Sequence, residues 1–122
     1  PYFAQEFMDG GSLEGVLTAT PRPPAEAARL IATLARAVHY AHQRGVLHRD
    51  LKPGNVLVDS RVGPMISDFG LAKLVEQDST ITQSAALLGT PAYMSPEQAD
   101  GQSRRLTTAV DVYGLGAILY EL

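Results

Sequence analysis

The sequence predicts an α+β fold that is mainly helical and contains one β-hairpin. Three features of the chain support this class. Residues 25–44 repeat apolar side chains at helical spacing, and two short β-type runs at residues 56–58 and 65–67 flank a turn-rich stretch. Residues 111–122 are apolar on nearly every side, so a helix there has to be buried in the middle of the fold.

Composition narrows the possible functions before any motif is considered. The chain has 122 residues, of which 45% are hydrophobic and 19% charged, as in an ordinary soluble domain. The net charge of −3 provides no basic surface for nucleic acid. The absence of cysteine excludes disulfides, thiolate metal sites and cysteine nucleophiles. No apolar run approaches the ~20 residues that are needed to span a bilayer.

The first predicted elements are short. Residues 1–7 are expected to form a strand that leads into the glycine pair at residues 10–11. Ser12 is of a type that caps helices, so a short helix is expected to follow it and to end near residue 18. After a proline-rich connector, Pro24 is expected at the first position of the next helix, where its missing N–H costs nothing.

The segment at residues 25–44 is predicted to be an amphipathic helix, with Gly45 as a left-handed cap. Its apolar stripe consists of Leu30, Ile31, Leu34, Val38 and Ala41. His39 and His42 lie three residues apart and could be read as metal ligands. No carboxylate or cysteine accompanies them, which favours a packing role.

The predicted hairpin gathers polar residues at its open end. If Val56 pairs with Ser67, then Asn55 lies opposite Asp68, with Cα atoms roughly 5 Å apart. An amide oxygen beside a carboxylate suits Mg²⁺, which takes few protein ligands and leaves positions for phosphate oxygens. Asp50 lies on the loop that enters the hairpin, where its carboxylate could accept a proton from an attacking hydroxyl.

These residues belong to two of three motifs that resemble those of protein kinases. The catalytic-loop pattern H-R-D-L-x-x-x-N is matched at residues 48–55, and D-F-G is matched at residues 68–70. Residues 95–97 resemble A-P-E, with serine in place of alanine. The motifs occur in the expected order, and the resemblance covers essentially all 122 residues. It is closest to the bacterial serine/threonine kinases of eukaryotic type.

The resemblance implies a protein-kinase-like fold that is cut at both ends. Residues 1–8 would be the last N-lobe strand and the hinge. Residues 9–122 would be the mainly helical C-lobe as far as its central helix. The glycine-rich loop and the strand lysine of the N-lobe would lie upstream, so we expect this piece to be inactive alone.

The activity that the resemblance implies is ATP-dependent phosphoryl transfer to Ser or Thr hydroxyls of protein substrates, with ATP and Mg²⁺ as cofactors. Asp50 would be the catalytic base. Lys52, beside it, would contact the transferred phosphate. Asn55 and Asp68 would hold the Mg²⁺ ions.

The resemblance also implies a nucleotide site around the hinge. The Glu6 carbonyl and the Met8 N–H would face adenine, with Gln5 as an unusually polar gatekeeper. Ser12 would lie near the ribose, and Leu57 would form the floor under adenine.

Residues 68–97 resemble the activation segment that receives protein substrates. Thr90 would bond the catalytic aspartate and Lys52, which favours serine/threonine over tyrosine specificity. Arg49, next to the catalytic base, is typical of kinases that are switched on by loop phosphorylation, either by another kinase or by themselves. The candidate acceptors, in a loop at residues 75–90 that is predicted to be mobile, are Ser79, Thr80, Thr82 and Ser84.

Two further assignments are structural. His48 and Phe69 resemble members of the hydrophobic spine of a kinase. Asp111 resembles the buried aspartate that anchors the catalytic-loop backbone, although it could also be the N-cap of the last helix.

Other classes of function remain open at this stage. The chain could belong to a pseudokinase scaffold, be an inactive fragment, or be a short non-catalytic binding module. A small-molecule kinase is a more distant alternative. We expect a cytoplasmic protein with no nucleic-acid partner, whose parent could be anchored in a membrane outside this chain.

Overall fold

The computed structural model describes residues 8–17, 21–69, 91–101 and 106–122. The elements, in chain order, are α1 (Leu13–Val16), α2 (Pro24–His42), η1 (Pro53–Asn55), β1 (Val56–Asp59), β2 (Gly63–Ile66), η3 (Pro91–Tyr93), α4 (Pro96–Ala99) and α5 (Ala109–Glu121). Helices combined with a two-stranded antiparallel sheet agree with the predicted α+β class. The strand predicted at residues 1–7 and the loop predicted at residues 75–90 lie outside the described residues.

The starts of the first two helices follow local sequence signals. Ser12 caps α1, because its Oγ accepts a hydrogen bond from the Gly15 N–H at 3.3 Å. Pro24 opens α2 as predicted. The end of α2 was predicted two residues too late, at Arg44 instead of His42. Gly45 does adopt the expected left-handed conformation, with φ of 74°, and its N–H bonds to the His42 carbonyl.

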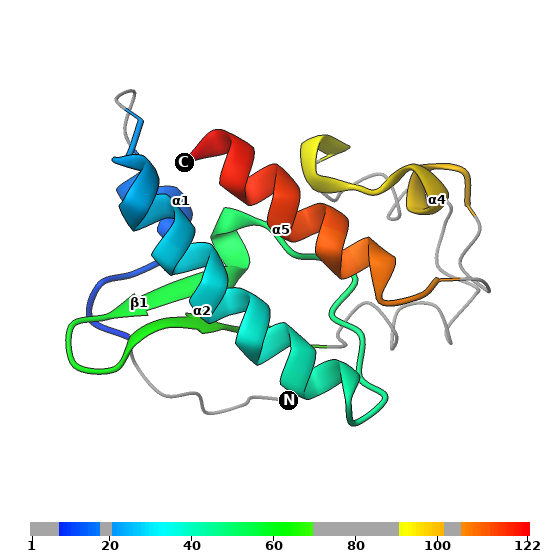
Figure 1. Ribbon diagram of the computed structural model, residues 1–122, viewed down its shortest axis with the longest axis horizontal. Helices are drawn as coiled ribbons and strands as arrows, with labels where there is room; N and C mark the ends of the chain where they lie inside the picture. The colour runs from blue at the N-terminus through cyan, green and yellow to red at the C-terminus, as the bar shows by residue number, and fades with distance from the viewer. Residues whose placement is uncertain (1–7, 18–20, 70–90, 102–105) are drawn as a thin grey trace, which may run out of the picture.

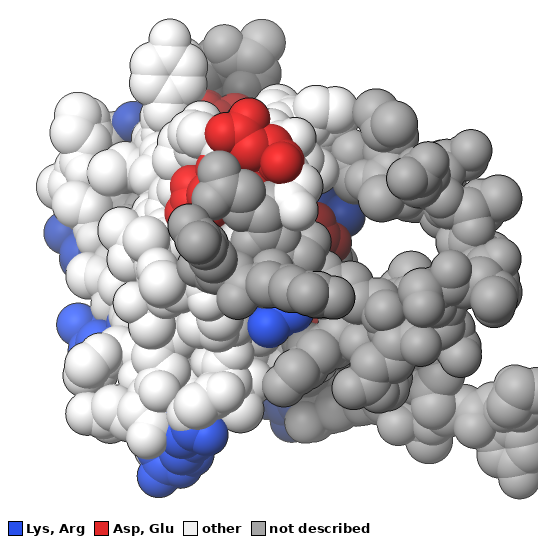
Figure 2. All heavy atoms as spheres, turned by 90° about the vertical axis from the view of Figure 1, so that its right-hand side faces the viewer, with Lys and Arg blue, Asp and Glu red and all other residues white. Residues whose placement is uncertain are grey.

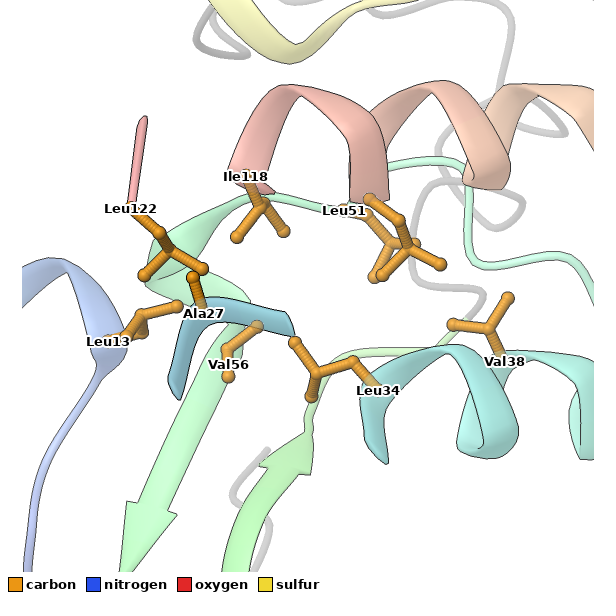
Figure 3. Packing of buried hydrophobic residues seen from close by; sticks show 9 residues of the cluster. Leu13, Ala27, Leu34, Val38, Leu51, Val56, Ile118 and Leu122 are labelled. Carbon is orange, nitrogen blue, oxygen red and sulfur yellow. The ribbon is translucent and has the colours of Figure 1, made fainter. Parts of the chain in front are cut away.

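The core lies between α2, α5, α1 and the hairpin. Figure 1 shows α2 and α5 as the two long helices, with the β1–β2 hairpin beside α2. The segment at residues 48–55 is called the catalytic loop below, after the motif that it matches. Apolar side chains from the named elements and from this loop meet in one cluster, which is shown in Figure 3. The buried members are Leu13, Ala27, Leu34, Val38, Leu51, Val56, Leu115, Ile118 and Leu122. The loop that carries the predicted catalytic residues therefore contributes to the core through Leu51.

Only one face of α5 is buried in the described part of the chain. That face contains Val110, Asp111, Gly114, Leu115 and Ile118. On the opposite side Val112 is 63% exposed and Tyr120 is 96% exposed. The described residues therefore cover one side of a helix whose sequence predicts burial on all sides. None of the helices described combines the length and the apolar character that crossing a bilayer would require.

The hairpin forms, but the predicted register was wrong by one residue. Val56 pairs with Ile66, not with Ser67, and Asp59 pairs with Gly63. The turn explains the difference, because the Asp59 Oδ1 accepts the N–H groups of Arg61 at 2.9 Å and of Val62 at 3.1 Å. These two bonds lower the pKa of Asp59, and the bond to Arg61 contributes most. Together with the left-handed φ of 85° at Gly63, they close a loop of three residues.

Two glycines of α5 provide a matched test of this packing. A Cβ added at Gly114 would lie 2.8 Å from the Leu51 Cβ and 3.1 Å from the Leu51 carbonyl oxygen, whereas one at Gly116 would meet no atom within 4 Å. We expect Gly114→Ala to lower the free energy of unfolding by about 1–3 kcal/mol through overpacking. Gly116→Ala should raise it by up to about 1 kcal/mol through helix propensity. Urea unfolding of both variants is the measurement, and shifts of the same sign would contradict the packing described.

Candidate active site

The segment between α2 and β1 is anchored by a buried carboxylate. Asp111 of α5 is 1% exposed. Its Oδ2 accepts the His48 N–H at 2.9 Å, and its Oδ1 accepts the Arg49 N–H at 2.7 Å. These bonds confirm the prediction that Asp111 anchors the catalytic-loop backbone. The alternative prediction, an N-cap, was wrong, because the N-cap of α5 is Thr108.

The anchored backbone includes a residue in an uncommon conformation. Arg49 has a φ of 70°, in the left-handed region that non-glycine residues seldom adopt. Such a conformation costs on the order of 1–3 kcal/mol and persists only where surrounding contacts fix it. The Gln98 Nε2 provides another contact by donating to the Arg49 carbonyl at 2.6 Å. Gln98 lies in α4, so that helix is tied directly to the catalytic loop.

His42 supports the anchor from α2. Its Nε2 lies 2.6 Å from the Asp111 Oδ2, which links α2, α5 and the catalytic loop through one carboxylate. The ring is therefore a hydrogen-bond partner of Asp111, in agreement with the structural reading of this histidine. Within the described ranges, no group of three or more His, Cys, Asp or Glu side chains is arranged to hold a metal ion.

His48 connects the catalytic loop to the end of β2. Its Nδ1 accepts the Asp50 N–H at 3.2 Å, and its Nε2 lies 2.8 Å from the Ser67 carbonyl oxygen. Both bonds form when the ring hydrogen is on Nε2. The ring also packs edge-on against Phe69, with centroids 4.8 Å apart and planes at 66°. The contact brings together the two residues that were predicted to belong to the hydrophobic spine.

Two of the predicted site residues, Lys52 and Asn55, converge on the carboxylate of a third, Asp50. The Lys52 Nζ lies 2.8 Å from the Asp50 Oδ2. The Asn55 Nδ2 donates to the same oxygen at 3.0 Å and to the Asp50 carbonyl at 2.7 Å. Because both bonds use the amide nitrogen of Asn55, its Oδ1 remains as the atom that can meet a cation. The Asp50 Oδ1 takes no part in these bonds, so it is the oxygen that could accept a proton.

Asp68 lies at the same end of the hairpin as Asn55. The Ser67 N–H donates to the Asn55 carbonyl at 2.9 Å, so Ser67 lies opposite Asn55 and Asp68 is one residue further on. The Ser67 hydroxyl lies 3.0 Å from the Asp68 Oδ2 and 3.3 Å from the Asn55 carbonyl oxygen. Asp68 has a φ of 61°, which ends the regular strand alternation. An amide oxygen and a carboxylate, both hard donors, suit Mg²⁺.

The described part of the predicted nucleotide site lies along β1. Leu57 is half-buried and forms an isolated antiparallel bridge with Ser12. The Ser12 Oγ is the acceptor that caps α1, a bond that does not use its own hydrogen. Met8 is half-buried at the start of the described chain. The other residues predicted to act here or in catalysis, Gln5, Glu6 and Thr90, lie outside the described residues, as do the four candidate phosphate acceptors.

The short helix η3 packs against α5. Tyr93 donates a hydrogen bond from its hydroxyl to Glu121, and its pKa is raised to about 12, first by burial and then by that bond. A cavity of about 630 Å³ opens beside the pair, and it is lined by Ala92, Tyr93, Tyr113, Gly116, Ala117, Tyr120 and Glu121. It adjoins the end of the segment that was predicted to receive a protein substrate.

Charged side chains are unevenly distributed on one side of the molecule. Figure 2 shows the side that lies to the right in Figure 1, where acidic side chains gather near the top of the described surface. Lys and Arg side chains are scattered over the rest of that surface. The described part of this face therefore carries no continuous basic patch of the kind that binds nucleic-acid phosphates.

Sequence reasoning missed three residues that shape this region. His42 was considered only as a packing residue or a metal ligand. Gln98, which bonds Arg49, and Ser60, which bonds Asp9, were not singled out. Their partners are 69, 49 and 51 residues away in the sequence, respectively. Only the contact between His42 and Asp111 had a related signal in the sequence, because the resemblance had already marked Asp111 as a buried anchoring residue.

Comparison with known proteins gives a consistent family. The family described as "Protein kinase domain" matches residues 1–122. The serine/threonine-protein kinase PknB of Mycobacterium leprae is 39% identical over 123 residues, which cover 100% of this chain and 20% of that protein. The DNA damage-responsive serine/threonine-protein kinase RqkA of Deinococcus radiodurans is 44% identical over 124 residues, covering 100% and 18%. The serine/threonine-protein kinase PkaA of Streptomyces coelicolor is 45% identical over 121 residues, covering 96% and 22%. The chain thus spans about a fifth of the length of these relatives.

The anchoring carboxylate can be tested by removing its charge. Asp111→Asn presents an NH₂ group to at least one of the two backbone N–H groups that the carboxylate accepts. A buried N–H left without an acceptor costs about 1–3 kcal/mol, so the free energy of unfolding should fall by that amount. Urea unfolding is the measurement, with the exposed Asp100→Asn as the matched control. Equal effects of the two substitutions would contradict the anchoring role.

Proposed function

The chain belongs to the protein kinase domain family, and from that premise we propose that the full-length protein transfers the γ-phosphoryl group of ATP to serine or threonine hydroxyls of protein substrates. The observation that carries this proposal is the convergence of Lys52 and Asn55 on the Asp50 carboxylate. Phosphoryl transfer depends mainly on positioning and on charge stabilisation, and this arrangement supplies both.

In this proposal Asp50 is the catalytic base. Its Oδ1 accepts the hydrogen of the substrate hydroxyl, while contacts from Lys52 and Asn55 fix its Oδ2. The ammonium group of Lys52 lies beside the base, where it can stabilise negative charge on the transferred phosphoryl group. Thr90 is proposed to bond both Asp50 and Lys52 and so to favour serine and threonine substrates.

Asn55 and Asp68 are proposed as the ligands of Mg²⁺. The Asn55 amide nitrogen is directed at Asp50, which leaves its oxygen for the metal, and the Asp68 carboxylate lies at the same end of the hairpin. When bound with ATP, the metal would neutralise phosphate charge. The donor set fits a hard cation that keeps several non-protein ligands.

The division into lobes and the residues that contact the nucleotide are also part of the proposal. Residues 1–8 are proposed as the last N-lobe strand and the hinge, and residues 9–122 as the C-lobe through α5. The Glu6 carbonyl and the Met8 N–H would bind the edge of adenine. Leu57 would lie under its ring, and Ser12 would donate its hydroxyl hydrogen to the ribose. Since ATP is the donor, we place the activity in the cytoplasm.

Regulation by phosphorylation is part of the proposal. A phosphate on Ser79, Thr80, Thr82 or Ser84 would carry about −1.5 to −2 charges and could pair with Arg49, which would order the substrate-binding segment. Another kinase, or the same one, would add it. A pseudokinase scaffold is the less favoured alternative, because Asp50, Asn55 and Asp68 are all intact.

Replacing Asp68 with asparagine tests the metal assignment. In the full-length protein, Asp68→Asn should reduce Mg²⁺-dependent phosphoryl transfer by at least about 100-fold, because a charge that holds the metal is lost. The urea midpoint should remain close to that of the parent, since Asp68 bonds only the neighbouring Ser67 among the described residues. Asp100→Asn serves as the matched control with normal activity. Near-normal turnover by Asp68→Asn would show that the assignment is wrong.

Substrate specificity gives a separate test. The full-length protein, incubated with labelled ATP and a mixed protein substrate, should yield phosphoserine and phosphothreonine, through Lys52 and the proposed contact from Thr90. Phosphoamino-acid analysis of the labelled product is the measurement. Predominant phosphotyrosine would contradict the proposed specificity.

A further inference from the structure

The segment that follows Met8 runs along the edge of β1. The Gly10 N–H donates to the Val58 carbonyl at 3.0 Å, and the Val58 N–H donates to the Gly11 carbonyl at 2.8 Å. A Cβ at Gly10 would lie 2.8 Å from the Val58 carbonyl oxygen, so only glycine permits this close approach. In Figure 1 this segment, in blue, passes beside the hairpin on its way to α1. The segment is therefore held against β1 through its backbone.

A side-chain contact reinforces this attachment at the hairpin turn. The Asp9 Oδ1 accepts the Ser60 N–H at 2.9 Å, and the Asp9 Oδ2 accepts the Ser60 hydroxyl at 2.5 Å. We call this two-bond contact the Asp9–Ser60 clamp. The hydroxyl first, and then the N–H, lower the pKa of Asp9, so its carboxylate is charged at neutral pH. A charged acceptor makes both bonds stronger than those between neutral groups.

The turn that carries Ser60 is itself fixed. The Asp59 side chain, 4% exposed, accepts two backbone N–H groups of the turn, and Gly63 closes it in a left-handed conformation. Asp9 therefore binds a turn whose shape is set by other contacts. Because the turn keeps its shape, it would not follow Asp9 if Asp9 moved relative to β1, and the two bonds of the clamp would break.

The clamp joins two chain segments that each carry a group assigned to adenine. Asp9 directly follows Met8, and Ser60 follows Leu57 at the end of β1. We propose that the Asp9–Ser60 clamp positions Met8 and Leu57 for nucleotide binding. It would do so by setting the distance between Met8, whose N–H is assigned to the edge of adenine, and Leu57, which is assigned to the floor under the adenine ring. The inference rests on the proposed function, because that proposal assigns these two residues to adenine.

The clamp should affect nucleotide affinity and leave turnover nearly unchanged. A preorganised site loses less conformational freedom when its ligand binds, so loosening the site weakens binding. The catalytic group is held separately, because Asp50, Lys52 and Asn55 contact one another and their loop is anchored by Asp111. A change confined to KM for ATP is therefore the signature of the positioning role.

The experiment measures KM for ATP and kcat in the full-length protein and in its variants. Asp9→Ala removes both bonds and should raise KM about threefold to tenfold, with kcat within about twofold of the parent. Ser60→Ala removes one bond and should give a smaller rise, and the double variant should be no worse than Asp9→Ala alone. Ser60→Thr keeps a hydroxyl and should restore a near-parental KM. Glu26→Ala, which removes an exposed carboxylate from α2, is the matched control.

Two outcomes would overturn the inference. If the parent protein is active but Asp9→Ala and Ser60→Ala leave KM unchanged, the clamp does not position the nucleotide. If the variants lower kcat and the urea midpoint while KM is constant, the clamp is only structural. Absence of both ATP binding and phosphoryl transfer in the parent protein would instead refute the proposed function, and the inference with it. A direct titration with a non-hydrolysable ATP analogue separates these cases.

Discussion

The geometry of the candidate site depends on the carboxylate of Asp111. Two backbone N–H groups of the catalytic loop and the ring of His42 all bond to this one buried group. The carboxylate thereby fixes the loop to both long helices of the core and holds Arg49 in a left-handed conformation. Burial of a carboxylate is tolerated when several donors bond to it, whereas burial of the same donors without an acceptor would lower the free energy of unfolding. The order of the loop and the integrity of the core are therefore coupled.

The anchored backbone at residues 48–49 also sets the position of Asp50, the proposed catalytic base. Asp50 is the next residue, and its own N–H bonds to the His48 ring, which also contacts the end of β2. Lys52 and Asn55 then reach back to the Asp50 carboxylate from the same loop. Gln98 joins α4 to the Arg49 carbonyl, and α4 begins within the last two residues of the proposed activation segment, so the end of that segment is connected to the same loop. A displacement of α4 would therefore act directly on the Arg49 carbonyl, which belongs to the peptide unit before Asp50, the proposed catalytic base.

Local signals in the sequence predicted local structure well. The Ser12 cap, the start of α2 at Pro24 and the existence of the hairpin each follow from residues close together in the chain. The register was wrong because strand pattern alone does not reveal that the Asp59 side chain closes the turn. Periodicity also could not find the bonds of His42, Gln98 and Ser60, since each partner lies far away in the sequence. The roles proposed for Asp50, Asn55 and Asp68 came from the predicted hairpin and from motif resemblance, and the structure adds the contact between Asn55 and Asp50.

The most direct test is the rate of amide hydrogen exchange at His48 and Arg49, measured by NMR in the folded full-length protein. If the Asp111 carboxylate holds these two N–H groups, they should exchange as slowly as buried amides of α5, despite lying in a loop. In Asp111→Asn at least one of them should exchange much faster, while the amides of α5 retain most of their protection. Exchange of both amides in the parent protein at the rate of an unstructured chain would contradict the anchoring role of Asp111.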